Sequence, residues 1–147
     1  WYPDMEDLRK KVEYNPNVVG ILLINPDNPT GMVYPKHILE EIVELAKEFG
    51  LILISDEIYH QITYNGARAY ALSEIIDDVP GIAMKGISKE LPWPGARCGW
   101  IECYNRDKSE DFDEFCNALD DAKMIPESSQ EGTQITQQSM KIILLLI

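Results

Sequence analysis

The chain has 147 residues, of which 45% are apolar, and a formal net charge of −12. This length is enough for one domain with a core. A chain so acidic is repelled by nucleic acid and by anionic membrane surfaces, so neither is expected as a partner. Its three cysteines, Cys98, Cys103 and Cys116, lack zinc-ligand spacing. We expect them to be free thiols in a reducing cytoplasm.

The first half of the chain has the pattern of a strand–helix–strand unit. Residues 18–24 and 51–54 are continuously apolar, which predicts strands buried on both faces. Residues 25–31, rich in asparagine and proline, predict a turn. A helix is predicted to open at Pro35, to carry an apolar stripe at spacings of three and four, and to stop at Gly50. The strands of such a unit run parallel.

The second half predicts two further strands and a helix. Residues 81–85 follow a segment long enough to cross back, so they are expected to form a third parallel strand. Residues 97–104 follow after only about ten residues, too few for a parallel crossover, and are expected to run antiparallel. A helix is predicted over residues 107–124, and the final apolar run, 142–147, is too short to span a bilayer. The expected fold is α/β, a mostly parallel sheet with flanking helices and one antiparallel strand.

Polar side chains stand just past the carboxyl ends of the predicted parallel strands. Asn28, Asp56 and Lys89 each occupy such a position, and ligands of open α/β sheets bind at that edge. A lysine at the end of a buried strand is costly unless its amine is used. Tyr59 and Arg97 lie close by in sequence. An amide, a carboxylate, an amine, a phenol and a guanidinium together suit one anionic, ring-bearing cofactor.

Three motifs in this order resemble the class I/II aminotransferases, pyridoxal-phosphate enzymes of fold type I. The motifs are Asn28-Pro29-Thr30-Gly31, Asp56-Glu57-Ile58-Tyr59, and Ser88-Lys89 followed by Arg97-Cys98-Gly99-Trp100. The resemblance implies that residues 1–147 are part of one pyridoxal-phosphate-binding large domain. It places the N-terminal arm and the small C-terminal domain of a longer enzyme outside this chain. It also implies a homodimer with active sites at the subunit interface.

The resemblance implies a chemical role for each site residue. Lys89 would form the Schiff base with the cofactor aldehyde and then move a proton at the substrate α carbon. Asp56 would face the pyridine nitrogen and keep it protonated, so that the ring withdraws electrons. Tyr59 and Asn28 would hydrogen-bond the phenolic oxygen of the ring. The catalytic residues expected from the resemblance are therefore Lys89, Asp56 and Tyr59.

The resemblance also implies which residues bind the cofactor phosphate. Arg97 would pair with it through its guanidinium, and Ser88 would add a hydroxyl. The chain departs from the family pattern at two places. Gly86 stands where many relatives carry a second serine, and Leu91-Pro92-Trp93-Pro94 replaces smaller and aliphatic residues. The second departure is expected to stiffen the loop and to alter the substrate pocket.

The expected function is pyridoxal-phosphate-dependent transfer of an amino group between an amino acid and a 2-oxo acid. A C–S β-lyase of the same fold uses the same lysine, aspartate, tyrosine and arginine, so it stays open as an alternative. A non-catalytic module that kept the fold is a second alternative, in which Lys89 would be dispensable. The isolated 147 residues are not expected to transaminate.

Ordinary structural roles compete with these functional ones. Aspartate is a preferred N-cap, so the alternative role of Asp56 is to cap a helix. The residues around Asn28 are typical of a turn. The alternative role of Arg97 is to form an ordinary ion pair. His37 and His60 have no partner at ligand spacing, so no metal site is expected.

Overall fold

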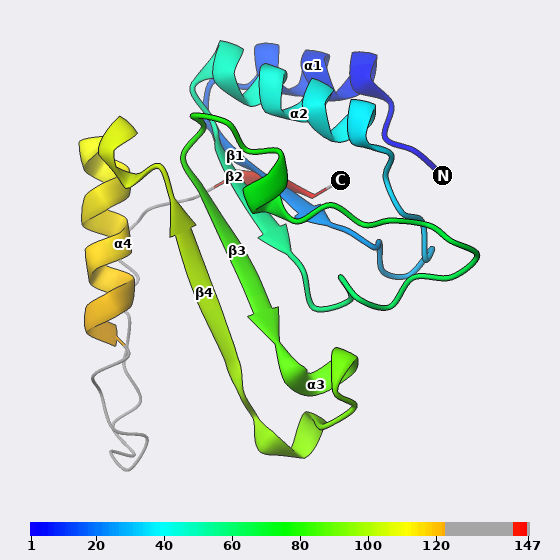
Figure 1. Cartoon of the computed structure of the whole chain (residues 1–147). Helices are drawn as coiled ribbons and strands as arrows, with labels where there is room; N and C mark the ends of the chain where they lie inside the picture. The colour runs from blue at the N-terminus through cyan, green and yellow to red at the C-terminus, as the bar shows by residue number, and fades with distance from the viewer. Residues whose placement is uncertain (123–142, 147) are drawn as a thin grey trace.

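The computed structural model describes residues 1–122 and 143–146 (Figure 1). These residues form one mixed sheet with the strand order β4-β3-β2-β1-β5. The strands are β1 (Val18–Ile24), β2 (Ile52–Asp56), β3 (Gly81–Gly86), β4 (Gly99–Tyr104) and β5 (Ile143–Leu146). The α-helices are α1 (Met5–Glu13), α2 (Lys36–Phe49), α3 (Ile87–Glu90) and α4 (Glu110–Ala122). Short 3-10 turns are η1 (Leu72–Glu74), η2 (Pro94–Ala96) and η3 (Arg106–Lys108).

The strand directions put three chain segments at one edge of the sheet. β1, β2 and β3 run parallel, and β4 runs antiparallel to β3. The register pairs Ile24 with Asp56 and Asp56 with Met84. The carboxyl ends of β1, β2 and β3 therefore lie side by side. The predicted fold class, a mostly parallel α/β sheet with one antiparallel strand, is confirmed.

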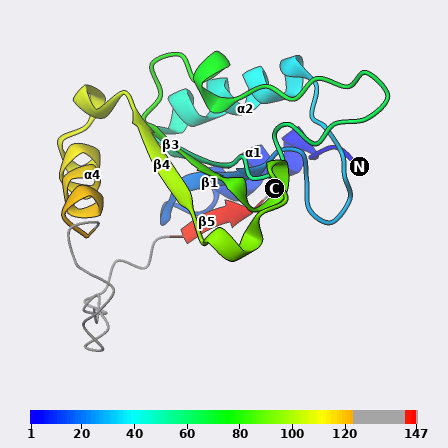
Figure 2. The same cartoon turned by 60° about the horizontal axis from the view of Figure 1, so that its bottom comes forward.

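Helices cover both faces of the sheet because side chains alternate along each strand. Ile21, Leu23 and Leu53 point to one face, where they are buried in a core shared with α1 and α2. Ile82 points to the other face and is buried in a smaller core with Phe112 of α4. Figure 2 shows α4 standing apart from α1 and α2. The sheet thus forms the middle layer between α1 and α2 on one face and α4 on the other.

The predicted helix after β1 is confirmed as α2. Pro35 is its N-cap, and Gly50 ends it in the left-handed conformation with φ of 63°, which a residue without a Cβ adopts freely. One stripe of α2 is buried against the sheet and the opposite side carries charges. Within residues 1–122, none of the helices has the length and hydropathy needed to span a membrane.

The first helix, α1, was not predicted from the sequence. Only Leu8 and Val12 of its residues are buried, so its apolar stripe is short. Asp4 caps its first turn by accepting the Asp7 N–H at 3.0 Å. Its charged face docks on α2 through Arg9, whose two Nη atoms each donate to the Glu48 carboxylate at 2.6 Å. The helix is stabilised locally by the Asp4 cap and by the i,i+4 ion pairs of Lys10 with Glu6 and of Lys11 with Asp7, and also by its docking on α2.

Several predicted boundaries were wrong by a few residues. β4 begins at Gly99, and Arg97 lies before it in a turn, because its φ of 48° is left-handed and not extended. The last helix, α4, begins at Glu110 because η3 occupies the preceding residues. Its predicted end at Met124 lies outside the described residues. Part of the final apolar run forms β5, which pairs in parallel with β1.

Gly81 begins β3 at a point where neighbouring groups leave no room for a side chain. A Cβ there would lie 2.5 Å from Ile76 Cδ1 and 2.8 Å from the Leu53 carbonyl oxygen. That oxygen belongs to the neighbouring strand β2. It can move away only if the strand itself shifts. We expect Gly81→Ala to lower the free energy of unfolding by about 1–3 kcal/mol, measured by urea denaturation. Gly95→Ala is the control, because a Cβ there meets nothing within 4 Å; equal losses in both variants would contradict the prediction.

Candidate active site

Three chain segments meet at the carboxyl edge of the sheet around the phenol ring of Tyr59. Asn28, in the turn after β1, donates from Nδ2 to the Tyr59 hydroxyl at 3.3 Å. Lys89, in α3 after β3, places Nζ 5.9 Å from the ring centroid of Tyr59, within the range of a cation–π interaction. The structure therefore brings together three of the residues predicted to form the site, each from a different segment.

The turn that carries Asn28 is organised by Asp27. The Asp27 carboxylate accepts the N–H of Thr30 at 3.2 Å and also the Thr30 hydroxyl. Its backbone N–H donates to the Met32 carbonyl at 2.8 Å, and its carbonyl accepts the Gly31 N–H at 2.9 Å. Bonds of this kind between an aspartate and nearby backbone are typical of turns. They hold the exposed Asn28 beyond the end of β1.

Asp56 is the last residue of β2 and begins the turn that carries Tyr59. It is half-buried, and its Oδ1 accepts the Ile58 N–H at 3.1 Å. The His60 N–H then donates to the Glu57 carbonyl at 3.0 Å. A turn follows Asp56, so its alternative role as a helix N-cap is not realised. The carboxylate of Asp56 and the phenol of Tyr59 belong to one short turn.

A buried ion pair lies beside this turn, on the residue that follows Asp56. Glu57 is 2% exposed and its Oε1 accepts the Leu72 N–H at 2.5 Å. Lys85 Nζ lies 3.5 Å from Glu57 Oε2 and 2.7 Å from Glu102 Oε2. Burial acts to lower the pKa of Lys85, but the hydrogen bond with Glu102 and the charge of Glu57 outweigh it, so the pKa is raised. Lys85 is therefore held as a cation and is a poor nucleophile.

Lys89 and Arg97 differ from the other cations of the described residues. Every other lysine and arginine side chain in residues 1–122 has a carboxylate oxygen within 4 Å. Lys89 lies on the Tyr59 ring, and Arg97 donates from Nη1 to the Pro94 carbonyl at 3.0 Å. The chain has a net charge of −12, yet both cations of residues 1–122 that have no carboxylate partner in the described structure lie within residues 89–97. This segment is suited to an anionic ligand.

The two residues predicted to bind phosphate are placed less closely. Ser88 is half-buried in α3 beside Lys89. The guanidinium of Arg97 turns back onto its own loop, so the described contacts do not join it to Tyr59. Gly86, the departure from the family pattern, has a structural reason. A Cβ at this position would lie 3.0 Å from Ile58 Cδ1 and 3.1 Å from the Cys98 carbonyl oxygen, so a larger residue would force its neighbours to shift.

Sequence reasoning missed the residues that hold the segments of the site in place. Glu57 and Lys85 carried a signal, because a charged side chain in or next to a buried strand needs a partner. Glu90 carried none. Its Oε1 accepts the Gln61 N–H at 3.0 Å, across 29 residues of sequence. Only the folded arrangement of α3 and the turn after β2 brings these two groups together.

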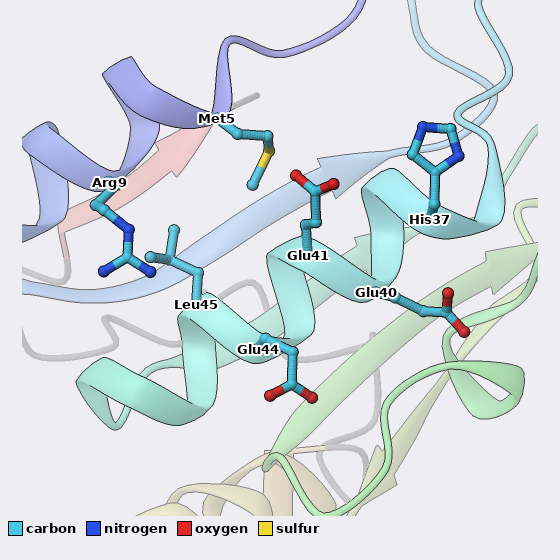
Figure 3. A pocket seen from close by; sticks show the side chains of 7 residues that line it. All are labelled: Met5, Arg9, His37, Glu40, Glu41, Glu44 and Leu45. Atoms are coloured by element: carbon cyan, nitrogen blue, oxygen red, sulfur yellow. The ribbon is translucent and has the colours of Figure 1, made fainter.

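A surface pocket of about 440 Å³ lies elsewhere, between α1 and α2 (Figure 3). Glutamates dominate its wall, and its arginine is already paired with Glu48. The pocket is lined by Met5, Arg9, His37, Glu40, Glu41, Glu44 and Leu45. Such a wall repels an anionic cofactor, so the pocket is not the predicted site. No group of three or more His, Cys, Asp or Glu residues in the described part of the chain is placed to hold a metal ion.

The chain belongs to the family described as aminotransferase class I and II, whose sequence profile matches residues 1–140. An uncharacterized aminotransferase of Methanocaldococcus jannaschii is 62% identical over 125 residues, which are 85% of this chain and 29% of that protein. The glutamate-pyruvate aminotransferase AlaA of Escherichia coli is 43% identical over 101 residues, 69% of this chain and 24% of that protein. The chain therefore spans less than a third of these relatives.

Solved structures agree with this assignment. An alanine aminotransferase from Pyrococcus furiosus has a TM-score of 0.75 and 36% identity, covering 86% of this chain and 32% of its own. A pyridoxal-phosphate-bound C–S lyase from Staphylococcus hominis has a TM-score of 0.63 and 32% identity, covering 67% of this chain and 25% of its own. The predicted family is confirmed, and its fold supports both kinds of chemistry.

Removing the Lys85 amine leaves the Glu57 carboxylate buried without a cation. We expect Lys85→Met to lower the free energy of unfolding by about 3–5 kcal/mol, the usual cost of breaking a buried pair. Lys36→Met is the matched control, because Lys36 pairs with Glu40 on the surface of α2 and such pairs contribute about 0.3–0.5 kcal/mol. Urea denaturation of both variants measures the difference. Surface ion pairs contribute at most about 1 kcal/mol. A loss below that size for Lys85→Met would therefore contradict the buried pairing.

The stability of the fold is expected to depend on pH through Glu102. Hydrogen bonds from Lys85 and then from Tyr104 lower the pKa of Glu102 to about 2, below its usual value of about 4.3. A carboxyl group with a lowered pKa stabilises the fold above its unfolded pKa, and this contribution is lost as pH falls toward the folded value. We therefore expect a loss between about pH 4.3 and about pH 2.

The variant Glu102→Gln should flatten this part of the profile, measured as the free energy of unfolding at a series of pH values. Glu114→Gln, on the exposed side of α4, is the control and should keep the wild-type profile. If Glu102→Gln and wild type lose stability in parallel as the solution is acidified, Glu102 is not responsible.

Proposed function

We propose that this chain is the central part of the cofactor-binding large domain of a pyridoxal-phosphate-dependent aminotransferase. The enzyme transfers an amino group between an amino acid and a 2-oxo acid. One observation carries the proposal: among the described residues, the two cations without a carboxylate partner, Lys89 and Arg97, lie in one short segment, and Lys89 of this segment lies over the ring of Tyr59. That segment stands at the edge of the sheet where α/β folds bind ligands.

The donor set of the site fits pyridoxal 5'-phosphate. The Asp56 carboxylate suits a protonated ring nitrogen, and the Tyr59 hydroxyl and Asn28 amide, already 3.3 Å apart, suit one phenolic oxygen. The amine of Lys89 suits the aldehyde. Of the two lysines that bracket the end of β3, Lys89 is the better nucleophile, because Lys85 is held as a cation between two carboxylates.

Each of the four site residues has a role in the proposed reaction. When bound, the cofactor supplies an electron-withdrawing ring that stabilises negative charge on the substrate α carbon. Lys89 holds the cofactor through its amine and moves a proton at the substrate α carbon. Asp56 keeps a proton on the ring nitrogen. Tyr59 and Asn28 orient the ring by donating to its phenolic oxygen.

The phosphate of the cofactor is bound by Arg97 and Ser88 in this proposal. A guanidinium can donate to two phosphate oxygens at once. To do so, the Arg97 side chain would exchange its hydrogen bond to the Pro94 carbonyl for bonds to the phosphate. Ser88 lies one residue before Lys89, so its hydroxyl can contact the phosphate while Lys89 contacts the aldehyde end.

Relatives named as alanine and glutamate-pyruvate aminotransferases support small amino acids and their 2-oxo acids as substrates. A homodimer is proposed from the family resemblance. It agrees with the exposure of Leu91, Trp93 and Trp100 near the site, at 64%, 63% and 46%, because a partner subunit would cover them. The free thiols of Cys98, Cys103 and Cys116 support a reducing compartment, the cytoplasm.

Replacement of the proposed catalytic amine tests the function directly. We expect Lys89→Ala, made in the full-length protein, to lower kcat by about a hundred- to ten-thousandfold, because the proton at the substrate α carbon loses its carrier. The absorbance change on adding pyridoxal 5'-phosphate should also be lost. Lys108→Ala, which removes an exposed lysine paired with Asp107, is the control. Unchanged activity and absorbance in Lys89→Ala would favour the non-catalytic module.

The C–S lyase alternative is favoured by one finding, the structural similarity to a C–S lyase. The two activities are separated by their products. Incubation of the full-length protein with alanine and 2-oxoglutarate yields glutamate if the protein is an aminotransferase. Incubation with cystathionine yields pyruvate and ammonia if it is a lyase. Release of ammonia from cystathionine without glutamate formation would replace the leading proposal.

A further inference from the structure

The turn that bears Lys89 has weak backbone connections of its own. α3 is a single turn of four residues, and a helix so short is not stable by itself. Its backbone hydrogen bonds are long. The Leu91 N–H donates to the Ile87 carbonyl at 3.3 Å, and the Ile87 N–H donates to the Cys98 carbonyl at 3.3 Å. Ordinary N–H···O bonds are about 2.9–3.0 Å. The position of Lys89 therefore needs support from outside α3.

Glu90 supplies that support through the turn after β2. Its Oε1 accepts the Gln61 N–H at 3.0 Å, within the ordinary range for such a bond. Gln61 lies in the turn that begins at Asp56, and the next N–H, of Ile62, donates to the Tyr59 carbonyl at 2.8 Å. The carboxylate of Glu90 thus joins α3 to the segment that carries Tyr59.

The same bond keeps the Glu90 carboxylate occupied. Successive residues on a helix point about 100° apart, so Lys89 and Glu90 have different partners. The described residues give Lys89 no ion pair with its neighbour, and its Nζ lies over the Tyr59 ring instead. A carboxylate released from Gln61 would be free to attract the adjacent amine away from that ring.

We propose that Glu90 is a positioning residue: by accepting the Gln61 N–H it fixes α3 against the turn of residues 56–61 and so sets the Lys89 amine over Tyr59. The chemical consequence rests on the proposed function, because it matters for the amine that would hold the cofactor. The mechanical part, one turn anchored by one carboxylate, stands on the hydrogen bond alone.

Two variants of the full-length protein test the proposal. Glu90→Ala removes the acceptor, whereas Glu90→Gln keeps an oxygen that can accept the Gln61 N–H. In the protein without cofactor, amide hydrogen exchange of Gln61 and of residues 87–91 should quicken about fivefold in Glu90→Ala, the effect of one lost hydrogen bond. It should stay within about twofold of wild type in Glu90→Gln.

The chemical consequence is measured on the same variants. Covalent attachment of added pyridoxal 5'-phosphate to Lys89, followed by absorbance, should slow about three- to tenfold in Glu90→Ala. Its kcat should fall by a similar factor with KM nearly unchanged, and Glu90→Gln should restore both. Asp4→Ala is the matched control, because it also removes a carboxylate that accepts a backbone N–H at 3.0 Å, on α1. It should change neither exchange in residues 87–91 nor attachment.

The exchange and attachment measurements separate the positioning role of Glu90 from the proposed function. Wild-type exchange and attachment in Glu90→Ala would overturn the positioning role. Glu90→Gln behaving like Glu90→Ala would also overturn it, because charge and not hydrogen bonding would then matter. If wild type attaches no cofactor while Glu90→Ala still quickens exchange in α3, the anchor is supported and the proposed function is lost.

Discussion

The parallel register of β1, β2 and β3 is the constraint on which the site depends. Because Ile24 pairs with Asp56 and Asp56 with Met84, the chain leaves all three strands at one edge. β4 pairs antiparallel with β3, with Gly99 opposite Gly86, so the segment between them leaves and returns at that same edge. A small shift of register would separate the amide, phenol and amine, since each comes from a different segment.

The sheet also decides the chemical character of two lysines four residues apart. Lys85 lies inside β3 and is enclosed between Glu57 and Glu102. Lys89 lies past the strand, on a turn where no carboxylate of the described residues reaches it. The fold thus pairs one amine with two carboxylates and leaves the other, at the edge of the sheet, without a carboxylate partner among the described residues. In a strongly acidic chain, this difference separates a structural lysine from a candidate catalytic one.

The segments at the edge are held differently from the layers that support them. α1, α2 and the sheet share an apolar core, whereas each site segment is held by a carboxylate that accepts a hydrogen bond from a backbone N–H group. Asp27 accepts from Thr30, Asp56 from Ile58, and Glu90 from Gln61. Loops positioned by a rigid scaffold are where binding and catalytic groups concentrate.

Much of the fold could be predicted because its signals are local. Residues 18–24 and 81–85 are continuous apolar runs, and a short connection requires an antiparallel strand. α1 was missed because only two of its residues, Leu8 and Val12, are apolar and buried, although its Asp4 cap is a local signal. By itself the sequence determined which polar groups follow each strand, since these are chain neighbours. Only the tertiary structure decided that Lys85 is paired with two carboxylates, that Lys89 meets no carboxylate of the described residues, and that Glu90 reaches Gln61. Such contacts join groups that folding alone brings within bonding distance.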